Sequence, residues 1–186
     1  MRIFIGLKLD KNVQDEIEKF LKPFKKLSSP IRWVKPQNIH ITLKFIGEVP
    51  GEKYSQMEEN LTAATFNTGP FNLTLAGCGK FGKKESLNIL WTGIAPNQKL
   101  EHIYNTIEDT LEKSGIEKET RPFKPHITVG RNKKNFNFKS FFKIIEEKKD
   151  LPITEFTVDG FQLFKSRLTP SGPVYSILKE IPLVAT

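Results

Sequence analysis

The sequence of 186 residues has little cysteine and little histidine, with one Cys and three His. Because Cys78 has no partner in the chain, no internal disulfide can form, and we expect a protein of a reducing, cytoplasmic compartment. The first ten residues, "MRIFIGLKLD", are too short and too charged for a signal peptide or a membrane span. We therefore expect a cytoplasmic protein with no membrane partner.

Several familiar site patterns are also absent. No GxxxxGK[ST], GxGxxG or GxSxG stretch occurs, so P-loop, Rossmann and α/β-hydrolase sites lack support. The stretch "GCGKFGKK" (77–84) lacks the spacing of a phosphate loop and is interpreted as a turn with a basic surface. No carboxylate or cysteine stands close in sequence to His40 or His126, whereas a metal site needs three or four ligands. We expect neither a metal nor a cofactor.

Basic residues are in excess. Lys and Arg number 29 against 21 Asp and Glu, which gives a net charge of +8 and a pI near 9.5. This surplus favours an anionic partner, with nucleic acid the leading candidate, although lysines spread evenly over the surface would only keep the protein soluble. An apolar fraction of 38% with 15 Phe indicates a folded globule of one domain's size.

Strand-type and helix-type patterns alternate along the chain. The helix expected first has apolar residues at helical spacing, Asp10 at its N-cap and Pro23 to bend or shorten it. We predict strands at 2–9, 31–34, 39–47, 71–81, 87–94, 154–165 and 173–182, and helices at 10–27, 52–66, 97–114 and 138–149.

The chain resembles itself after a shift of 86 positions. The shift places His40 on His126, Pro36 on Pro122 and the helix 10–27 on the helix 97–114. Most of the chain aligns by element type, although residue identity is low outside the histidine motifs. We therefore predict a single α+β domain over 1–186 with two pseudo-symmetric lobes. Each lobe would be an antiparallel sheet with helices packed outside, around a central groove.

The same short motif, His-Ile-Thr followed by an apolar residue, occurs at 40–43, in the expected strand 39–47, and at 126–129, where we expect the matching strand of the second lobe. In a strand, residues i and i+2 point to the same face. Each His and Thr should therefore face a groove together while the two apolar residues anchor the strand in the core. The polar residues are His40, Thr42, His126 and Thr128, and the buried ones are Ile41, Leu43, Ile127 and Val129.

Two imidazoles and two hydroxyls facing one space suit a phosphodiester. One histidine can deprotonate an attacking water while the other protonates the leaving oxygen, because imidazole titrates near neutral pH. The threonine hydroxyls can bind the phosphate oxygens, and Arg131 can form a charged clamp on them. Lys124 should share the face of His126, and Phe123 and Trp33 are either stacking platforms for bases or core residues. The third histidine, His102, should be exposed and uninvolved.

These features resemble the 2H phosphoesterase superfamily, in particular its RNA 2',3'-cyclic phosphodiesterases, historically called 2'-5' RNA ligases. The resemblance rests on both intact motifs, with "WVKPQNIHITLKFIG", "RPFKPHITVGR" and "LFKSRLTPSGPVYSIL" around and after them. It implies hydrolysis of RNA 2',3'-cyclic phosphate ends to 2'-phosphates without metal, and a reverse joining of RNA ends. His40 would be the proton donor and His126 the proton acceptor, with Thr42, Thr128 and Arg131 binding substrate.

Two alternatives remain open at this stage. One is a non-catalytic module that binds RNA or a nucleotide. The other is a phosphodiesterase acting on a different small cyclic or 2'-5' linked nucleotide. Because the predicted pseudo-twofold axis lies within one chain, we expect a monomer whose partner is RNA with a 2',3'-cyclic phosphate end, or a cyclic nucleotide. The near-symmetry of the two motifs does not distinguish acid from base.

Overall fold

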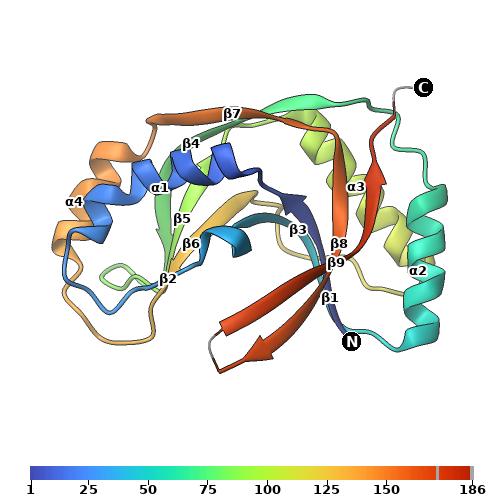
Figure 1. Cartoon of the computed structure of the whole chain (residues 1–186), viewed down its shortest axis with the longest axis horizontal. Coiled ribbons are helices and arrows are strands. Elements are labelled where there is room, and N and C mark those ends of the chain that lie inside the picture. The colour runs from blue at the N-terminus through green and yellow to red at the C-terminus, as the bar shows by residue number, and fades with distance from the viewer. Residues whose placement is uncertain (171, 185–186) are drawn as a thin grey trace.

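A computed structural model describes residues 1–170 and 172–184. Within them the chain forms two antiparallel sheets and four α-helices, which confirms the predicted α+β class (Figure 1). In the described part of the chain, no helix has the length and apolar character needed to cross a bilayer.

Sheet A, the first of the two, has four strands in the order β3-β1-β8-β9. Helices α2 and α3 pack together, α3 contacts β3 and α2 contacts β9, so both cover the same face. Among the described residues, α2 and α3 are the α-helices that pack on sheet A, and the face opposite them is called the open face below. The elements are β1 (Arg2–Lys8), β3 (His40–Glu48), β8 (Gly160–Thr169), β9 (Gly172–Pro182), α2 (Gly51–Ala63) and α3 (Gln98–Lys113).

Sheet B has five strands in the order β2-β6-β5-β4-β7. Helix α1 packs against β7 and α4, and α4 packs against β4. A single turn of 3-10 helix, η1 (Pro36–Asn38), leads from β2 into β3. The other elements are β2 (Arg32–Trp33), β4 (Phe71–Phe81), β5 (Ile89–Ile94), β6 (His126–Arg131), β7 (Pro152–Val158), α1 (Lys11–Lys25) and α4 (Lys139–Lys148).

Helices α1 and α3 each pack on the sheet that does not contain the strand before them. Helix α1 follows β1 of sheet A in the chain but packs on sheet B, and α3 follows β5 of sheet B but packs against β3 of sheet A. Each sheet is therefore covered in part by a helix whose preceding strand belongs to the other sheet. Figure 1 shows the two groups of helices at opposite ends of the molecule.

The local helix signals are obeyed with one exception. Helix α1 buries the apolar face expected from its spacing, including Val13, Ile17 and Phe24, and Pro23 lies in its last turns. Asp10 is at the N-cap of α1, but its side chain makes no capping hydrogen bond. In α3, by contrast, the N-cap residue Asn97 does make a capping hydrogen bond: its side-chain oxygen accepts from the Leu100 N–H at 3.0 Å.

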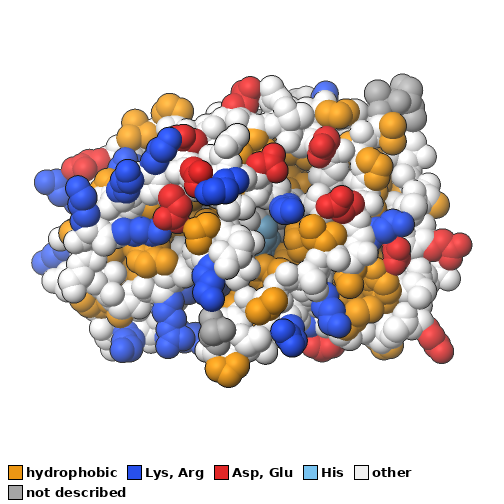
Figure 2. Space-filling model, in the orientation of Figure 1, with side chains coloured by type: hydrophobic (Ala, Val, Ile, Leu, Met, Phe, Trp, Pro, Cys, Tyr) orange, Lys and Arg blue, Asp and Glu red, His pale blue; other side chains and the backbone are white. Residues whose placement is uncertain are grey.

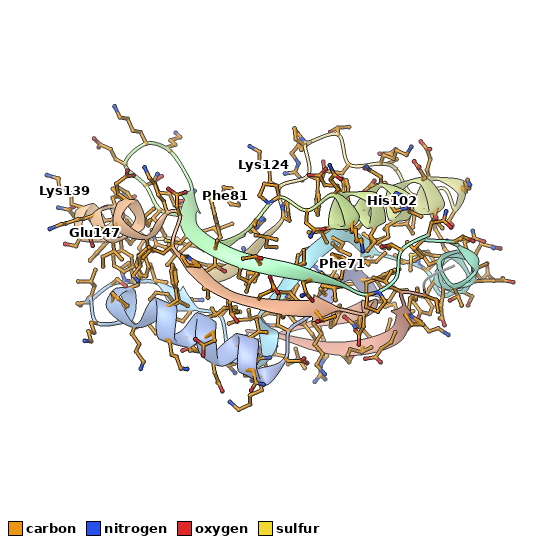
Figure 3. All side chains as sticks on the ribbon, turned by 90° about the horizontal axis from the view of Figure 1, so that it is seen from above. Phe71, Phe81, His102, Lys124, Lys139 and Glu147 are labelled. Carbon is orange, nitrogen blue, oxygen red and sulfur yellow. The ribbon has the colours of Figure 1, made fainter. Side chains whose placement is uncertain are left out.

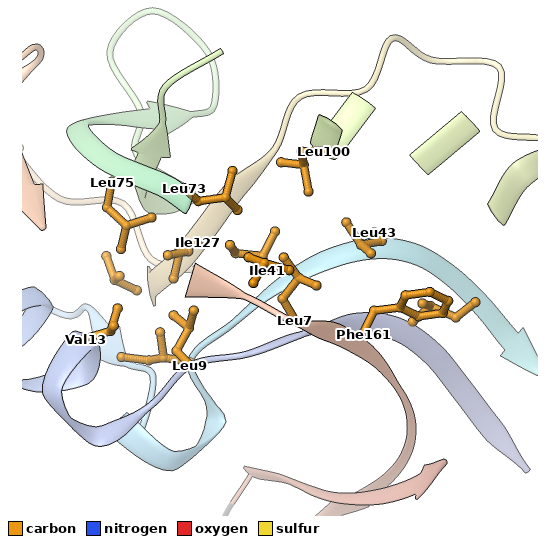
Figure 4. Close-up of a cluster of buried hydrophobic side chains, with 14 of the residues drawn as sticks. Leu7, Leu9, Val13, Ile41, Leu43, Leu73, Leu75, Leu100, Ile127 and Phe161 are labelled. Carbon is orange, nitrogen blue, oxygen red and sulfur yellow. The ribbon is translucent and has the colours of Figure 1, made fainter. Parts of the chain in front are cut away.

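The two sheets share one core. Ile41 of the first motif and Ile127 of the second are both fully buried, and they lie in the same cluster of apolar side chains (Figure 4). Strands β3 and β6 contact each other although they belong to different sheets. The apolar halves of the two motifs therefore fix the two histidine strands next to one another.

One predicted strand is wrong. The run 154–165 was expected to be a single strand, but β7 ends at Val158 and β8 begins at Gly160. Val158 pairs with Phe71 in sheet B, whereas Gly160 pairs with Pro182 in sheet A. The chain changes sheets at Asp159. Asp159 and Gly160 at the break have low strand propensity and form a turn signal, so the sequence marks an interruption here but not the change of sheet.

Candidate active site

His40 is the first residue of β3, and its imidazole lies over the open face of sheet A. Its Cα pairs with Lys8 and that of Thr42 pairs with Gly6. Gly6 allows the close approach of β3, because a Cβ there would lie 2.5 Å from the Ile41 carbonyl oxygen, whereas its 3.7 Å distance from His40 Cδ2 would be an ordinary contact. A glycine at this point of β1 is thus required by the approach of the β3 backbone.

Both histidine strands change register just after their threonine. In β3, Gly6 pairs with Thr42 and Ile5 with Lys44, so Leu43 is the extra residue. In β6, Trp91 pairs with Thr128 and Leu90 with Gly130, so Val129 is the extra residue. Such bulges reverse the alternation of the side chains that follow.

The bulge in β6 decides where Arg131 points. Ile89 pairs with Arg131 and Trp91 with Thr128, and residues two apart on β5 share a face. Arg131, five residues after His126, therefore shares its face with His126 and Thr128. In an unbroken strand a residue at that odd spacing would point to the opposite side.

The two imidazoles are held in the same way. His40 Nδ1 lies 2.7 Å from the Asn38 carbonyl oxygen, and His126 Nδ1 lies 2.8 Å from the Lys124 carbonyl oxygen. A carbonyl oxygen only accepts, so each Nδ1 carries the proton and each Nε2 has a free lone pair in the neutral ring. Both rings thus present Nε2 for proton transfer.

Aromatic side chains surround each imidazole. The His40 ring lies 4.7 Å from the Phe4 ring and 5.2 Å, edge-on, from the Tyr175 ring, measured between centroids. The His126 ring lies 5.0 Å from the Phe81 ring, at 90° to it, and 6.4 Å from the Trp91 ring. These contacts limit the ring positions from both sides and exclude water from part of each histidine.

Electrostatics link the two motifs. Burial lowers the pKa of His40, and the positive charges of Arg131 and His126 lower it further, while the hydrogen bond to Asn38 opposes them. Arg131, from sheet B, also acts on Tyr175 of sheet A, whose pKa is raised by burial. Two residues of sheet B, Arg131 and His126, therefore act on His40 across the boundary between the sheets, and Arg131 also acts on Tyr175.

The remaining predicted residues fall into two groups. Thr42 and Thr128 are half-buried, and in residues 1–170 and 172–184 neither hydroxyl has a hydrogen-bond partner. The other four residues lie in structural or surface positions. The side chain of Lys124 is exposed, and the Phe123 ring stacks on the Tyr104 ring with 3.9 Å between centroids. Trp33 packs against the core, with Lys25 Nζ near its ring. His102 is exposed, and its Nε2 lies 2.8 Å from the Phe66 carbonyl oxygen.

Sequence reasoning missed the aromatic residues around the two imidazoles. Tyr175 reaches His40 because β9 pairs with β8 in a register that places Tyr175 opposite Ser166. Phe81 stands at the end of β4, on the same edge of the molecule as Lys124 (Figure 3). The sequence "TPSG" (169–172) is a local signal for pairing of the strands before and after it, but nothing local indicates the contact of Tyr175 with His40. No cluster of three His, Cys, Asp or Glu side chains suited to a metal ion occurs among the described residues.

Comparison with known proteins identifies the family. The family model described as "2'-5' RNA ligase superfamily" matches residues 13–169. The chain belongs to this superfamily. It is 36% identical over 180 residues to a Methanocaldococcus jannaschii protein named RNA 2',3'-cyclic phosphodiesterase, covering 97% of this chain and 99% of that protein. A Thermotoga maritima protein of the same name is 33% identical, with 97% and 94% covered.

Solved structures of the superfamily share the fold. TT0787 of Thermus thermophilus superposes with a TM-score of 0.74 at 26% identity, covering 98% of each chain. E. coli LigT complexed with 3'-AMP superposes with a TM-score of 0.78 at 24% identity, covering 98% of this chain and 97% of LigT. The family model and the two relatives confirm the predicted resemblance to the superfamily.

Proposed function

We propose that this protein is an RNA 2',3'-cyclic phosphodiesterase that opens the cyclic end to a 2'-phosphate without a metal. The paired imidazoles support this best, because a backbone carbonyl orients each one and leaves Nε2 free for proton transfer. The name shared by the relatives from M. jannaschii and T. maritima points to the same reaction.

In the proposed reaction His126 Nε2 takes a proton from water as the water oxygen attacks phosphorus. The bond between phosphorus and the 3' oxygen breaks, and His40 Nε2–H donates its proton to that oxygen. The products are a 2'-phosphate monoester and a free 3'-hydroxyl. His40 then gains a proton and His126 loses one to solvent. Joining RNA ends through a 2'-5' bond would use the same step, with a 5'-hydroxyl in place of water.

Thr42, Thr128 and Arg131 would bind the non-bridging phosphate oxygens. The two hydroxyls are without partners in the part of the chain that the structure describes, and Arg131 shares the face of His126. Hydrogen bonds from such groups strengthen as charge accumulates on the oxygens in the transition state. The basic surface adds attraction for RNA, and Figure 2 shows Lys and Arg gathered over the end of the molecule formed by α1 and α4.

The lowered pKa of His40 has a consequence for its role as the acid. In the free protein the ring is largely neutral at pH 7, whereas the proton donor must be charged. A bound phosphate anion offsets the charge of Arg131 and so raises the pKa of His40. Substrate binding would thus favour the protonated form of His40 that acts as the acid. Since the reaction needs one protonated and one neutral imidazole, kcat/KM should fall at both low and high pH.

The test is an assay on a short RNA with a 2',3'-cyclic phosphate end in EDTA, with product position read by mass and phosphatase sensitivity. His40→Ala and His126→Ala should each lower kcat/KM at least about a hundredfold, since each removes a proton-transfer partner. His102→Ala is the matched control, because His102 is exposed and belongs to neither motif. Activity that survives both motif substitutions contradicts the mechanism.

The alternatives predict other results. A non-catalytic module would bind RNA in a salt-sensitive way in both His→Ala variants and form no product. An enzyme for another small cyclic or 2'-5' linked nucleotide would prefer that compound in a substrate panel. Gel filtration tests the monomer prediction, and cell fractionation tests the cytoplasmic one.

A further inference from the structure

The open face of sheet A continues beyond His40 as an exposed apolar surface. Phe45 is 54% exposed, Ile177 37% and Leu168 65%. Phe45 pairs with Phe4, Phe4 with Phe164 and Phe164 with Ile177, so these four side chains form one row across the sheet, in which the outer pair, Phe45 and Ile177, is exposed and the inner pair is buried. Contiguous exposed apolar patches, especially ones rimmed by polar residues, mark interaction sites or ligand-binding grooves.

Phe45 occupies a position in β3 that matches Arg131 in β6. It stands five residues after His40, as Arg131 stands five after His126, and the bulge at Leu43 turns it to the face of the histidine. The side chain of the neighbouring Lys44 points to the opposite face, where it binds Glu108 of α3. This agrees with Phe45 pointing to the open face. Phe45 is therefore on the catalytic side of β3.

A cation accompanies the exposed ring. The Arg2 guanidinium lies 5.0 Å from the centroid of Phe45. Glu48, which pairs with Arg2 across the strands, interacts at 3.4 Å with the amino group of Met1. Within the described residues Arg2 has no ion pair, so a ring and a free positive charge are offered together, as nucleic-acid sites require.

The outer half of the β8–β9 hairpin extends this surface. Strand β1 pairs with β8 only as far as Lys165, so the hairpin projects beyond the sheet (Figure 1). The sequence from Lys165 to Ile177 contains no Asp or Glu. Asn38 Nδ2 donates to the Pro173 carbonyl oxygen at 2.8 Å, which ties the hairpin to the residue that orients His40. The hairpin thus adds the exposed side chains of Leu168 and Ile177 without adding negative charge, and it is tied to the candidate site through Asn38.

We propose that the open face of sheet A binds the RNA chain preceding the cyclic phosphate, with a base stacked on Phe45 beside Arg2. This rests on the proposed function and assigns its substrate class as an oligoribonucleotide rather than a mononucleotide. Phe45 is five residues from His40, or about 16 Å along the strand, farther than the terminal nucleotide reaches. Tyr175, next to His40, is near the terminal nucleotide instead.

The experiment compares 2',3'-cyclic AMP with a short oligoribonucleotide ending in a 2',3'-cyclic phosphate, using Phe45→Ala. One base stacked on an aromatic ring strengthens binding by about tenfold. KM for the oligoribonucleotide should rise about tenfold, with kcat for it and both constants for cyclic AMP unchanged. Leu151→Ala is the control, because Leu151 is an apolar residue of similar exposure (45%) in the segment before β7.

Equal effects on the two substrates, or none, overturn the proposal. If the wild-type protein hydrolyses neither substrate, the proposed function fails. RNA binding by the open face is then tested separately, by fluorescence anisotropy with the same RNA. Tenfold weaker RNA binding by Phe45→Ala then supports the proposal, and unchanged binding overturns it. If Phe45→Ala alters self-association in gel filtration while RNA binding is unchanged, the face is a protein interface and the proposal is wrong.

Discussion

Replacing Gly6 by alanine should disable the site without touching a catalytic group. The added Cβ would lie 2.5 Å from the Ile41 carbonyl oxygen, about 0.9 Å closer than an ordinary contact begins. That oxygen belongs to the backbone of β3, so the strand must move, and His40 and Thr42 on either side of Ile41 move with it. Because β3 is an edge strand of sheet A, the movement is outward.

The expected size follows from that distance. A misplacement of about 1 Å in a catalytic group costs about a hundredfold in rate. Overpacking of this kind also destabilises the fold by about 1–3 kcal/mol. We therefore expect kcat/KM for the cyclic-phosphate substrate to fall about a hundredfold in Gly6→Ala, together with a lower melting temperature.

Gly51→Ala is the matched control, because nothing lies within 4 Å of a Cβ at Gly51, the first residue of α2. It should keep wild-type kinetics and gain up to about 1 kcal/mol from helix propensity. Activities are compared at a temperature where circular dichroism shows every variant folded, and the NMR shifts of the His40 ring report its displacement directly. A folded Gly6→Ala protein with wild-type kcat/KM and unchanged His40 shifts would refute the reasoning.

Three further predictions concern the titration of His40 and a buried ion pair. Because the folded-state pKa of His40 is lowered, the unfolded chain binds more protons there, so stability should decline as pH falls below about 6.5; His40→Gln should flatten this decline in urea midpoints. Removing the charge in Arg131→Ala should raise the pKa of His40 in an NMR titration, and an unchanged pKa would place Arg131 too far away to act. Lys44 and Glu108 form a buried ion pair at 2.7 Å, so Lys44→Met should cost about 3–5 kcal/mol in urea unfolding, most of it recovered when Glu108→Leu is added.

The two motifs were readable from the sequence because local rules govern them. Alternation predicts that Ile41 and Ile127 are buried, and both are. Apolar spacing likewise predicts α1 and α3, whose bounds differ from the expected ones by at most two residues. Such features depend on neighbours within a few positions, which is the range over which side-chain periodicity carries information.

The shift of 86 positions remains a prediction about how the lobes are related. Strand β1 is next to β3, and β5 is next to β6, as such a relation requires, although β6 has β2 as a second neighbour. The shift also places 87–94 on 173–180 and so equates β5 with β9, but β9 is an edge strand of sheet A whereas β5 is an inner strand of sheet B. The order of helices and strands in the sequence thus predicts which strands are neighbours better than it predicts whether a strand lies at the edge or inside its sheet.

By itself, the sequence determined which residues of β3 and β6 are polar, which are buried and which chemistry two histidines can perform. Tertiary structure alone decided that Arg131 and Phe45 turn to the histidine faces, because bulges at Val129 and Leu43 reverse the alternation there. It also decided that Tyr175 lies against His40 and that the chain changes sheets at Asp159. These features depend on strand pairing and packing between segments far apart in the chain, which side-chain periodicity within one strand does not encode.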